Sequence, residues 1–426
     1  MDPVTILTAA AAFLVFGLLS RRLEGTVLTG PMLFAAFGVL AGPAAIGLIS
    51  LNISNTGLHI LAEVTLILVL FSDAASIDLR RLRRDHNLPV RMLVVGMPLT
   101  ILFGAIAAMI LFADFSMWEA ALLAAILAPT DAALGQAVVV NHAVPVRIRQ
   151  ALNVESGLND GIALSVVLVF AALASATQEP ADASYWLLFG LKQISLGPIA
   201  GIVVGYVGAK LVAFCHRAGW LTESAEGVIA LALAFGAYAL AELFHGNGFV
   251  AAFIAGLAFG NTLAFKCKYL YEFAETEGQI LILLTFMAFG IVMIPMMIPD
   301  INATYIAFAV LVLTVIRMLP VSVALLGSGI KPVTSLFLGW FGPRGLASIL
   351  FALLILEKTD IAHKDEVFVA IILTVVMSIL LHGSTAGPFS RWYGLRAKEM
   401  GDCAENMPVP EEPFSDSLKP VAKTGS

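Results

Sequence analysis

Residues 148–176 read IRQALNVESGLNDGIALSVVLVFAALASA. From Ile162 to Ala174 every residue except Ser165 is apolar. The run is long enough for a helix that crosses the apolar core of a bilayer, which takes about 20 residues. It nevertheless contains a carboxylate, Asp160, well inside the predicted span. Because an ionisable group within a bilayer costs free energy, a residue of this kind is typical of a functional site.

The remainder of the chain repeats the apolar pattern of this stretch. Of its 426 residues 59% are hydrophobic and only 13% are charged, whereas a soluble domain has about 25% charged residues. The sequence therefore predicts an all-α membrane protein with roughly thirteen transmembrane helices. The predicted spans are 3–19, 27–49, 57–74, 90–113, 117–140, 148–176, 184–214, 222–243, 246–263, 274–297, 303–327, 333–356 and 366–386.

The distribution of lysine and arginine predicts the orientation in the membrane. If the N-terminus lies outside, the outward loops hold only Lys358 and Lys364, and the remaining loop cations face inward. Cytoplasmic loops carry such an excess of positive charge. The N-terminus lacks the basic region of a cleavable signal peptide, so we expect an uncleaved first helix. The expected location is the cell inner membrane, multi-pass, with a cytoplasmic C-terminus.

Composition divides the chain into two parts and excludes several classes of function. Residues 1–396 form the predicted transmembrane domain, and residues 397–426, rich in Glu, Pro and Ser, form a short disordered cytoplasmic tail. No basic patch interleaved with aromatic residues indicates nucleic-acid binding. The three cysteines have no metal-ligand spacing, and no cofactor or enzymatic activity is expected. The predicted partners are the lipid bilayer, monovalent cations and protons.

Two predicted spans are interrupted by residues that break helices. Residues 128–131 (APTD) lie in the fifth span and residues 341–345 (FGPRG) in the twelfth. Thirteen spans divide into six, one and six, so the second set of six runs opposite to the first. Inverted repeats with paired discontinuous helices are a common plan of secondary transporters, and the breaks point to the substrate site. We therefore expect two inverted six-helix repeats.

The oxygen-bearing side chains near the first break form a candidate cation site. Ser156 and Asp160 are four residues apart and share a helix face. Thr130 and Asp131 lie at the break. Hydroxyl, carboxylate and carbonyl oxygens are the ligands that hard cations prefer, so this set suits sodium. Asp131 could instead cap the second half-helix, and both interpretations could hold at once.

Other ionisable residues in the spans have less certain roles. A buried arginine such as Arg344 needs a carboxylate partner, and Glu155 is the predicted partner. Asp73, at the end of the third span, could reach the site or lie at the interface. The partner of Arg317 in the eleventh span stays open.

Three sequence motifs, in their order along the chain, resemble those of the NhaP-type sodium/proton antiporters of the monovalent cation:proton antiporter 1 family. They are Pro129-Thr130-Asp131, Glu155-Ser156-Gly157-Leu158-Asn159-Asp160-Gly161 and Gly342-Pro343-Arg344-Gly345. The resemblance covers about residues 3–390. It implies a homodimer in which dimer-interface and mobile core subdomains interleave, with discontinuous fifth and twelfth helices that cross near the site.

The resemblance also implies roles for individual residues. Cation and proton binding would fall to Thr130, Asp131, Ser156, Asn159 and Asp160, with Asp73 as a further acidic residue. Asn159 beside Asp160 implies electroneutral exchange, and Glu155 with Arg344 implies a structural ion pair.

These observations predict a sodium/proton antiporter that works by alternating access at one buried aspartate. Potassium in place of sodium is the alternative within transporters. A cation channel and an intramembrane aspartyl protease using Asp131 and Asp160 are more remote alternatives. The sequence shows no repeated carbonyl filter or charged ring of a channel, and the protease leaves Arg344 and the second break without a role.

Overall fold

The computed structural model describes residues 3–407, except 24–25, 50, 52–55, 80–81, 83–86, 177–182, 223–224, 264–267, 357–359 and 402. The described part of the chain is helical and contains no strand. Nine of its helices are long and apolar enough to cross a membrane, and three shorter helices are also apolar. The predicted all-α membrane fold is confirmed.

The α-helices overlap the predicted apolar runs, and most of their ends lie within a few residues of the predicted ends. The unbroken ones are α1 (Pro3–Leu23), α2 (Gly30–Ala41), α3 (Thr56–Ser76), α9 (Val146–Ala176), α10 (Ala183–Arg217), α11 (Ala225–Leu243), α12 (Gly248–Thr262) and α19 (Lys364–Glu399). Composite spans are α5 (Asn87–Arg91) with η1 (Met92–Gly96) and α6 (Met97–Leu111), α13 (Lys268–Ala288) with η2 (Phe289–Met293) and α14 (Ile294–Met297), and α15 (Ala303–Leu313) with α16 (Val315–Ala324). The arrangement as inverted repeats stays a prediction.

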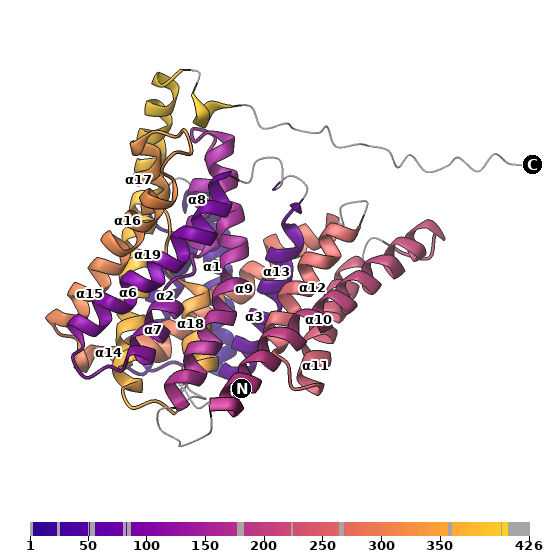
Figure 1. Ribbon diagram of the computed structural model, residues 1–426, viewed down its shortest axis with the longest axis horizontal. Helices are drawn as coiled ribbons and strands as arrows, with labels where there is room; N and C mark the ends of the chain where they lie inside the picture. The colour runs from indigo at the N-terminus through magenta and orange to yellow at the C-terminus, as the bar shows by residue number, and fades with distance from the viewer. Residues whose placement is uncertain are drawn as a thin grey trace, which may run out of the picture.

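Two spans are discontinuous where the breaker residues predict it. The fifth consists of α7 (Met117–Ile126) and α8 (Ala132–Val139). The twelfth consists of α17 (Pro332–Trp340) and α18 (Leu346–Phe351), which continues as η4 (Ala352–Leu356). In Figure 1, α8 and α17 lie in the upper half of the molecule and α7 and α18 in the lower half. Four half-helix ends therefore meet at mid-height.

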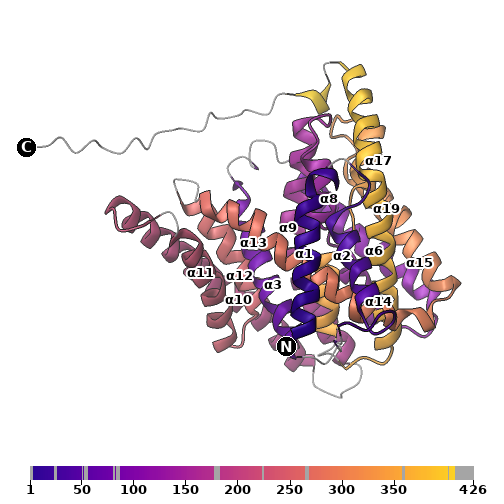
Figure 2. The ribbon, with the colours of Figure 1, turned by 180° about the vertical axis from the view of Figure 1, so that it is seen from behind.

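The helices form two groups with α9 between them. One group contains α10, α11 and α12, and the other contains α6, α15, α16, α17 and α19 (Figure 1), as the view from behind also shows (Figure 2). Small residues allow close packing in the first group. A Cβ on Gly201 would lie 2.5 Å from the carbonyl oxygen of Ala251, and one on Gly205 would lie 2.3 Å from that of Ala255.

The folded part of the chain extends further towards the C-terminus than the sequence predicts. Helix α19 ends at Glu399, and a short turn, η5 (Ala404–Asn406), folds back on the helical domain. Glu405 is fully buried there, and accepts hydrogen bonds from the Lys331 amide at 2.6 Å and the Thr334 hydroxyl at 2.9 Å. The predicted tail boundary at residue 397 is therefore too early, because Glu405 finds buried partners. Residues 408–426 lie outside the described residues.

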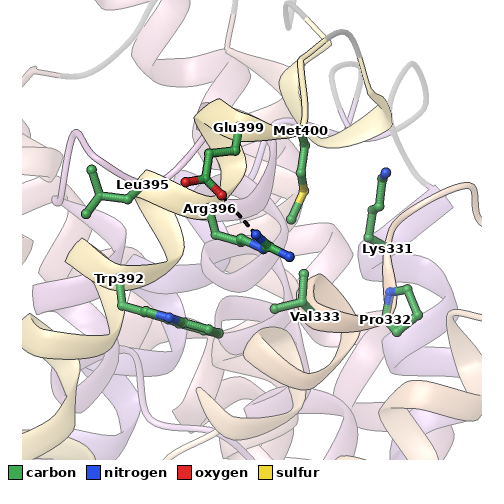
Figure 3. A pocket seen from close by; sticks show the side chains of 8 residues that line it. All are labelled: Lys331, Pro332, Val333, Trp392, Leu395, Arg396, Glu399 and Met400. Carbon is green, nitrogen blue, oxygen red and sulfur yellow. Dashed lines mark hydrogen bonds and ion pairs between the residues drawn. The ribbon is translucent and has the colours of Figure 1, made fainter.

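A groove of about 790 Å³ lies beside this turn (Figure 3). Lys331, Pro332 and Val333 form its side at the start of α17, and Trp392, Leu395 and Arg396 of α19 lie opposite. None of the predicted site residues lines it.

Candidate cation-binding site

Asp131 holds the ends of two half-helices together. Its Oδ1 accepts hydrogen bonds from the amides of Ala133 (2.7 Å) and Leu134 (3.3 Å) and so caps α8. Its Oδ2 accepts the amide of Leu346, the first residue of α18, at 2.6 Å. A carboxylate also complements the positive end of each helix dipole. The capping interpretation is confirmed, and a direct role in cation binding stays a prediction.

A direct backbone contact adds to this connection. The Asp131 amide donates a hydrogen bond to the carbonyl oxygen of Pro343 at 2.8 Å. The hydroxyl of Ser348, on α18, donates to the carbonyl oxygen of Ile126, the last residue of α7, at 2.8 Å. The two breaks are therefore joined by hydrogen bonds on both sides of Asp131.

Arg344 lies at the C-terminal end of a half-helix, whereas Asp131 lies at N-terminal ends. Its side chain is fully buried, and Nη1 donates to the carbonyl oxygens of Ala128 (2.9 Å) and Pro129 (3.1 Å), just beyond the end of α7. A cation is favourable there because the C-terminal end of a helix carries partial negative charge. The carbonyl oxygens of Ala128 and Pro129, in the first break, thus accept hydrogen bonds from Arg344.

The predicted ion pair between Glu155 and Arg344 is wrong. Glu155, on α9, pairs instead with Arg317, on α16, with 2.5 Å between Oε1 and Nη2. All three side chains are buried, and the guanidinium of Arg344 is directed to the end of α7, which leaves Glu155 to Arg317. The partner that the sequence left open for Arg317 is therefore Glu155. The two arginines and one glutamate leave one positive charge in excess in the buried cluster.

Polar side chains of α9 face the first break. The hydroxyls of Thr130 and Ser156 are 3.1 Å apart, and Asn159 Nδ2 donates to the Thr130 hydroxyl at 2.6 Å. Ser156 and Asn159 are three residues apart on α9 and so meet Thr130 from one helix face. The sequence-predicted contact between the fifth and sixth spans is thus present as two side-chain hydrogen bonds.

Two side-chain oxygens of α9 near the first break, one from a carboxamide and one from a carboxylate, accept no hydrogen bond from the described part of the protein. Asn159 Oδ1 and Asp160 Oδ1 are both buried, and neither has a hydrogen-bond partner in the described part of the chain. Asp160 as a whole keeps partial exposure. A buried acceptor without a donor costs free energy. The oxygen of Asp160 is therefore suited to bind a proton or a cation.

Asp73, on α3, lies beside the part of α9 that carries Asp160. A Cβ on Gly157 of α9 would lie 3.8 Å from the Asp73 carbonyl oxygen, which places the two helices in contact at this level. Asp73 and Asp160 are both partly exposed, whereas Asp131 is buried.

Sequence reasoning missed two residues of α19 that contact the second break. Ser378 Oγ accepts the amide of Arg344 at 2.6 Å, and His382 Nε2 lies 2.9 Å from the carbonyl oxygen of Trp340. Both side chains are buried. A serine and a histidine four residues apart inside an apolar span were the available signal.

The fold and site together define a class of protein. An all-helical membrane protein with two broken helices that meet at a buried carboxylate is a secondary transporter of the discontinuous-helix kind. The match to a known family agrees: the family described as "Sodium/hydrogen exchanger, transmembrane" matches residues 9–392. The chain belongs to this family of monovalent cation/proton antiporters. It is thus a multi-pass membrane transporter and not an enzyme.

Similar proteins include curated antiporters and a solved structure. The K(+)/H(+) antiporter NhaP of Alkalimonas amylolytica is 25% identical over 99% of this chain and 72% of its own length. The K(+)/H(+) antiporter NhaP2 of Shewanella oneidensis is 24% identical over 89% of this chain, and the match spans 64% of that protein. The sodium proton antiporter MjNhaP1 of Methanocaldococcus jannaschii shares the fold, with a TM-score of 0.75, 20% identity, and coverage of 92% of this chain and 99% of that one.

Proposed function

We propose that this protein exchanges a monovalent cation, sodium in the first place, for a proton at Asp160. The observation that carries the proposal is the buried Asp160 Oδ1, which has no hydrogen-bond partner in the described part of the chain. The adjacent hydroxyls of Thr130 and Ser156, 3.1 Å apart, supply further oxygen ligands of the type that sodium accepts. Asn159 Oδ1 adds a fourth oxygen.

The mechanism follows from the energetics of one buried carboxylate. Burial disfavours its charged form, so Asp160 is stabilised either by a proton or by a cation, and one ligand displaces the other. A bare carboxylate carries an uncompensated charge that is costly to move through hydrocarbon. We therefore propose that the group of helices carrying the site changes its access only when Asp160 is occupied, which couples the two fluxes.

Three further features belong to this proposal. Exchange of one cation for one proton is electroneutral, and Asn159 beside Asp160 supports that stoichiometry through the family resemblance. The N-terminus lies outside and the C-terminus in the cytoplasm of the inner membrane, as the loop cations indicate. The protein acts as a homodimer, in which one helix group forms the interface and the other, with Asp131 and Arg344, moves as the core.

Potassium is the second candidate cation. The relatives from Alkalimonas and Shewanella are named potassium/proton antiporters, whereas the structural neighbour is named a sodium proton antiporter. Oxygen ligands alone suit both ions.

An aspartyl protease is disfavoured by the geometry at Asp131. Both oxygens of that carboxylate accept backbone amides, so it is committed to two helix ends instead of activating water.

Proteoliposome exchange tests the proposal. With a pH dye inside, wild-type protein should move protons when sodium is added, and Asp160→Asn should not, because an amide cannot exchange a proton. Asp114→Asn, an exposed carboxylate between α6 and α7, is the matched control and should retain the wild-type rate. The same vesicles with sodium, lithium or potassium rank the cations. Exchange at the wild-type rate by Asp160→Asn would refute the mechanism.

Stoichiometry is tested in the same vesicles. A membrane potential imposed with potassium and valinomycin, with sodium as the exchanged ion, should leave the initial rate unchanged within experimental error. A rate that follows the potential would show electrogenic exchange while leaving the Asp160 mechanism intact.

A further inference from the structure

We propose that Ser378 and His382 of α19 are positioning residues that hold the second helix break, and through it Thr130 and Asp131, in the geometry that binds the cation. The inference rests on the proposed function and adds two residues to it. Neither residue belongs to the motifs around the breaks or Asp160.

Both residues are buried against the break. Ser378 has no exposed surface and His382 is 1% exposed. Ser378 Oγ accepts the Arg344 amide at 2.6 Å and lies 3.1 Å from His382 Nδ1. His382 Nε2 lies 2.9 Å from the Trp340 carbonyl oxygen. One turn of α19 thus contacts Trp340, the last residue before the break, and Arg344, two residues ahead of α18.

One assignment of hydrogens in a neutral imidazole connects Ser378 to Trp340 through His382. Nδ1 also lies 3.0 Å from the backbone carbonyl oxygen of Ser378, which would accept a hydrogen carried by Nδ1. A carbonyl oxygen can only accept, so His382 Nε2 must carry the hydrogen that is donated to Trp340. Nδ1 is then an acceptor, and the Ser378 hydroxyl donates to it. Ser378 Oγ in turn accepts the Arg344 amide. Every donor in the chain from Arg344 to Trp340 has an acceptor.

The network completes a pattern at the crossing. Asp131 satisfies the N-terminal ends of α8 and α18, and Arg344 satisfies the C-terminal end of α7. His382 does the same for the C-terminal end of α17. Helix ends leave backbone groups without intrahelical partners. Each of the four half-helix ends here has a side-chain partner, and His382 supplies the fourth, at a carbonyl oxygen that also accepts the Gly342 amide.

The connection to the cation site passes through Arg344 and Pro343. Arg344, fixed at its amide by Ser378, binds the carbonyl oxygens of Ala128 and Pro129, directly before Thr130. The Pro343 carbonyl oxygen accepts the Asp131 amide at 2.8 Å. A shift of the second break therefore displaces the ligands of the first break relative to Ser156 and Asp160 on α9.

Side-chain substitutions can separate the two arms of the network. Asn at 382 keeps an acceptor at the position of Nδ1 but is too short for Trp340, whereas Gln at 382 reaches Trp340 and loses the Ser378 contact. Ser378→Ala removes the Arg344 arm, and Ser378→Thr restores the hydroxyl. Thr374→Val is the matched control, because Thr374 is equally buried on α19 and donates only to Ala370 of its own helix.

The test measures apparent KM for sodium and maximal rate in proteoliposomes made from the full chain. Ser378→Ala should raise KM about ten-fold or more, roughly 1.4 kcal/mol of cation affinity, and Ser378→Thr should recover most of the loss. His382→Asn and His382→Gln should each raise KM less than His382→Leu. Thr374→Val should keep the wild-type KM.

Two outcomes separate the possible failures. If wild-type protein exchanges cations but the variants change only the amount of active protein, with KM within two-fold of wild type, Ser378 and His382 are merely structural and the inference is overturned. If wild-type protein shows no cation-dependent proton movement, the proposed function itself fails. Sodium-dependent protection against thermal unfolding, measured in detergent on the same variants, gives the affinity change without transport and should follow KM.

Discussion

At the scale of single residues, the partners of the buried charges decide how the site is built. Arg317 takes the carboxylate of Glu155 at 2.5 Å, and Arg344 takes the carbonyl oxygens at the end of α7. Removing one partner of a buried pair leaves an uncompensated charge in a medium that solvates it poorly. Glu155 is therefore needed to compensate the charge of Arg317.

A double-mutant cycle measures which arginine Glu155 stabilises. Glu155→Gln should lower the free energy of unfolding by about 3–5 kcal/mol, seen as a lower melting temperature in detergent. Glu155→Gln with Arg317→Gln should be much less destabilised than the sum of the single changes. The control pair, Glu155→Gln with Arg344→Gln, should be closer to additive. A larger coupling to Arg344 than to Arg317 would contradict the observed pairing.

At the scale of elements, the two broken helices cross so closely that the glycines of the second break leave no space for a side chain. A Cβ on Gly345 would lie 2.0 Å from Asp131 Oδ2, and one on Gly342 would lie 2.5 Å from Arg317 Nε. The φ of Gly345 is −162°, an extended value that any residue adopts. Glycine is required at 345 for space and not for a left-handed conformation.

Gly345→Ala should therefore abolish or strongly reduce exchange, because the added methyl displaces Asp131 from the amide of Leu346. Gly135→Ala is the matched control on α8, where a Cβ would meet nothing within 4 Å. It should retain exchange, with a helix stabilised by roughly 1 kcal/mol. Sodium-driven proton movement and melting temperature in detergent check both variants. Equal transport by the two would show that Asp131 can be displaced without consequence.

At the scale of the whole molecule, η5 ties the end of the described chain to the helix group that contains the breaks. Arg147, near the start of α9, donates to the Ala404 carbonyl oxygen at 2.6 Å, and Glu405 binds the start of α17. Burial by itself raises the pKa of Glu405, but hydrogen bonds from Lys331, Cys403 and Thr334, with its own amide, lower the pKa overall. The contact therefore contains a charged carboxylate at neutral pH.

Glu405→Gln should lower the free energy of unfolding at pH 7 by about 1–3 kcal/mol. The loss is measured as a lower melting temperature. A pKa lowered on folding gives stability that is complete above the unfolded value, near 4.3, and that is lost as the pH falls through the folded value. The difference between wild type and variant should thus stay constant from pH 6 to 8 and shrink below about pH 4.3. Glu399→Gln, in an exposed pair with Arg396, is the control and should change little at any pH. A difference that grows on acidification would contradict this sign.

Much of the site could be predicted because its signals are local. The breaker residues predict both discontinuities, and the three- and four-residue spacings predict that Ser156, Asn159 and Asp160 lie close along one helix. The pairing of Glu155 could not be predicted, since Arg317 and Arg344 are both buried arginines in the sequence and only their directions in space differ. Ser378, His382 and Glu405 carry no local pattern that connects them to residues 331–344.

The sequence by itself determined the membrane class, the helical spans, the two breaks and the buried carboxylate, because bilayer length, hydropathy and helix-breaking residues act within a short stretch of chain. Only the tertiary structure decided which arginine meets Glu155, that Asp131 caps two helices, that Arg344 binds the end of α7, and that α19 supports the second break. These are contacts between residues more than 30 positions apart, and hydrogen-bond partners at that separation are set by how the helices pack in three dimensions.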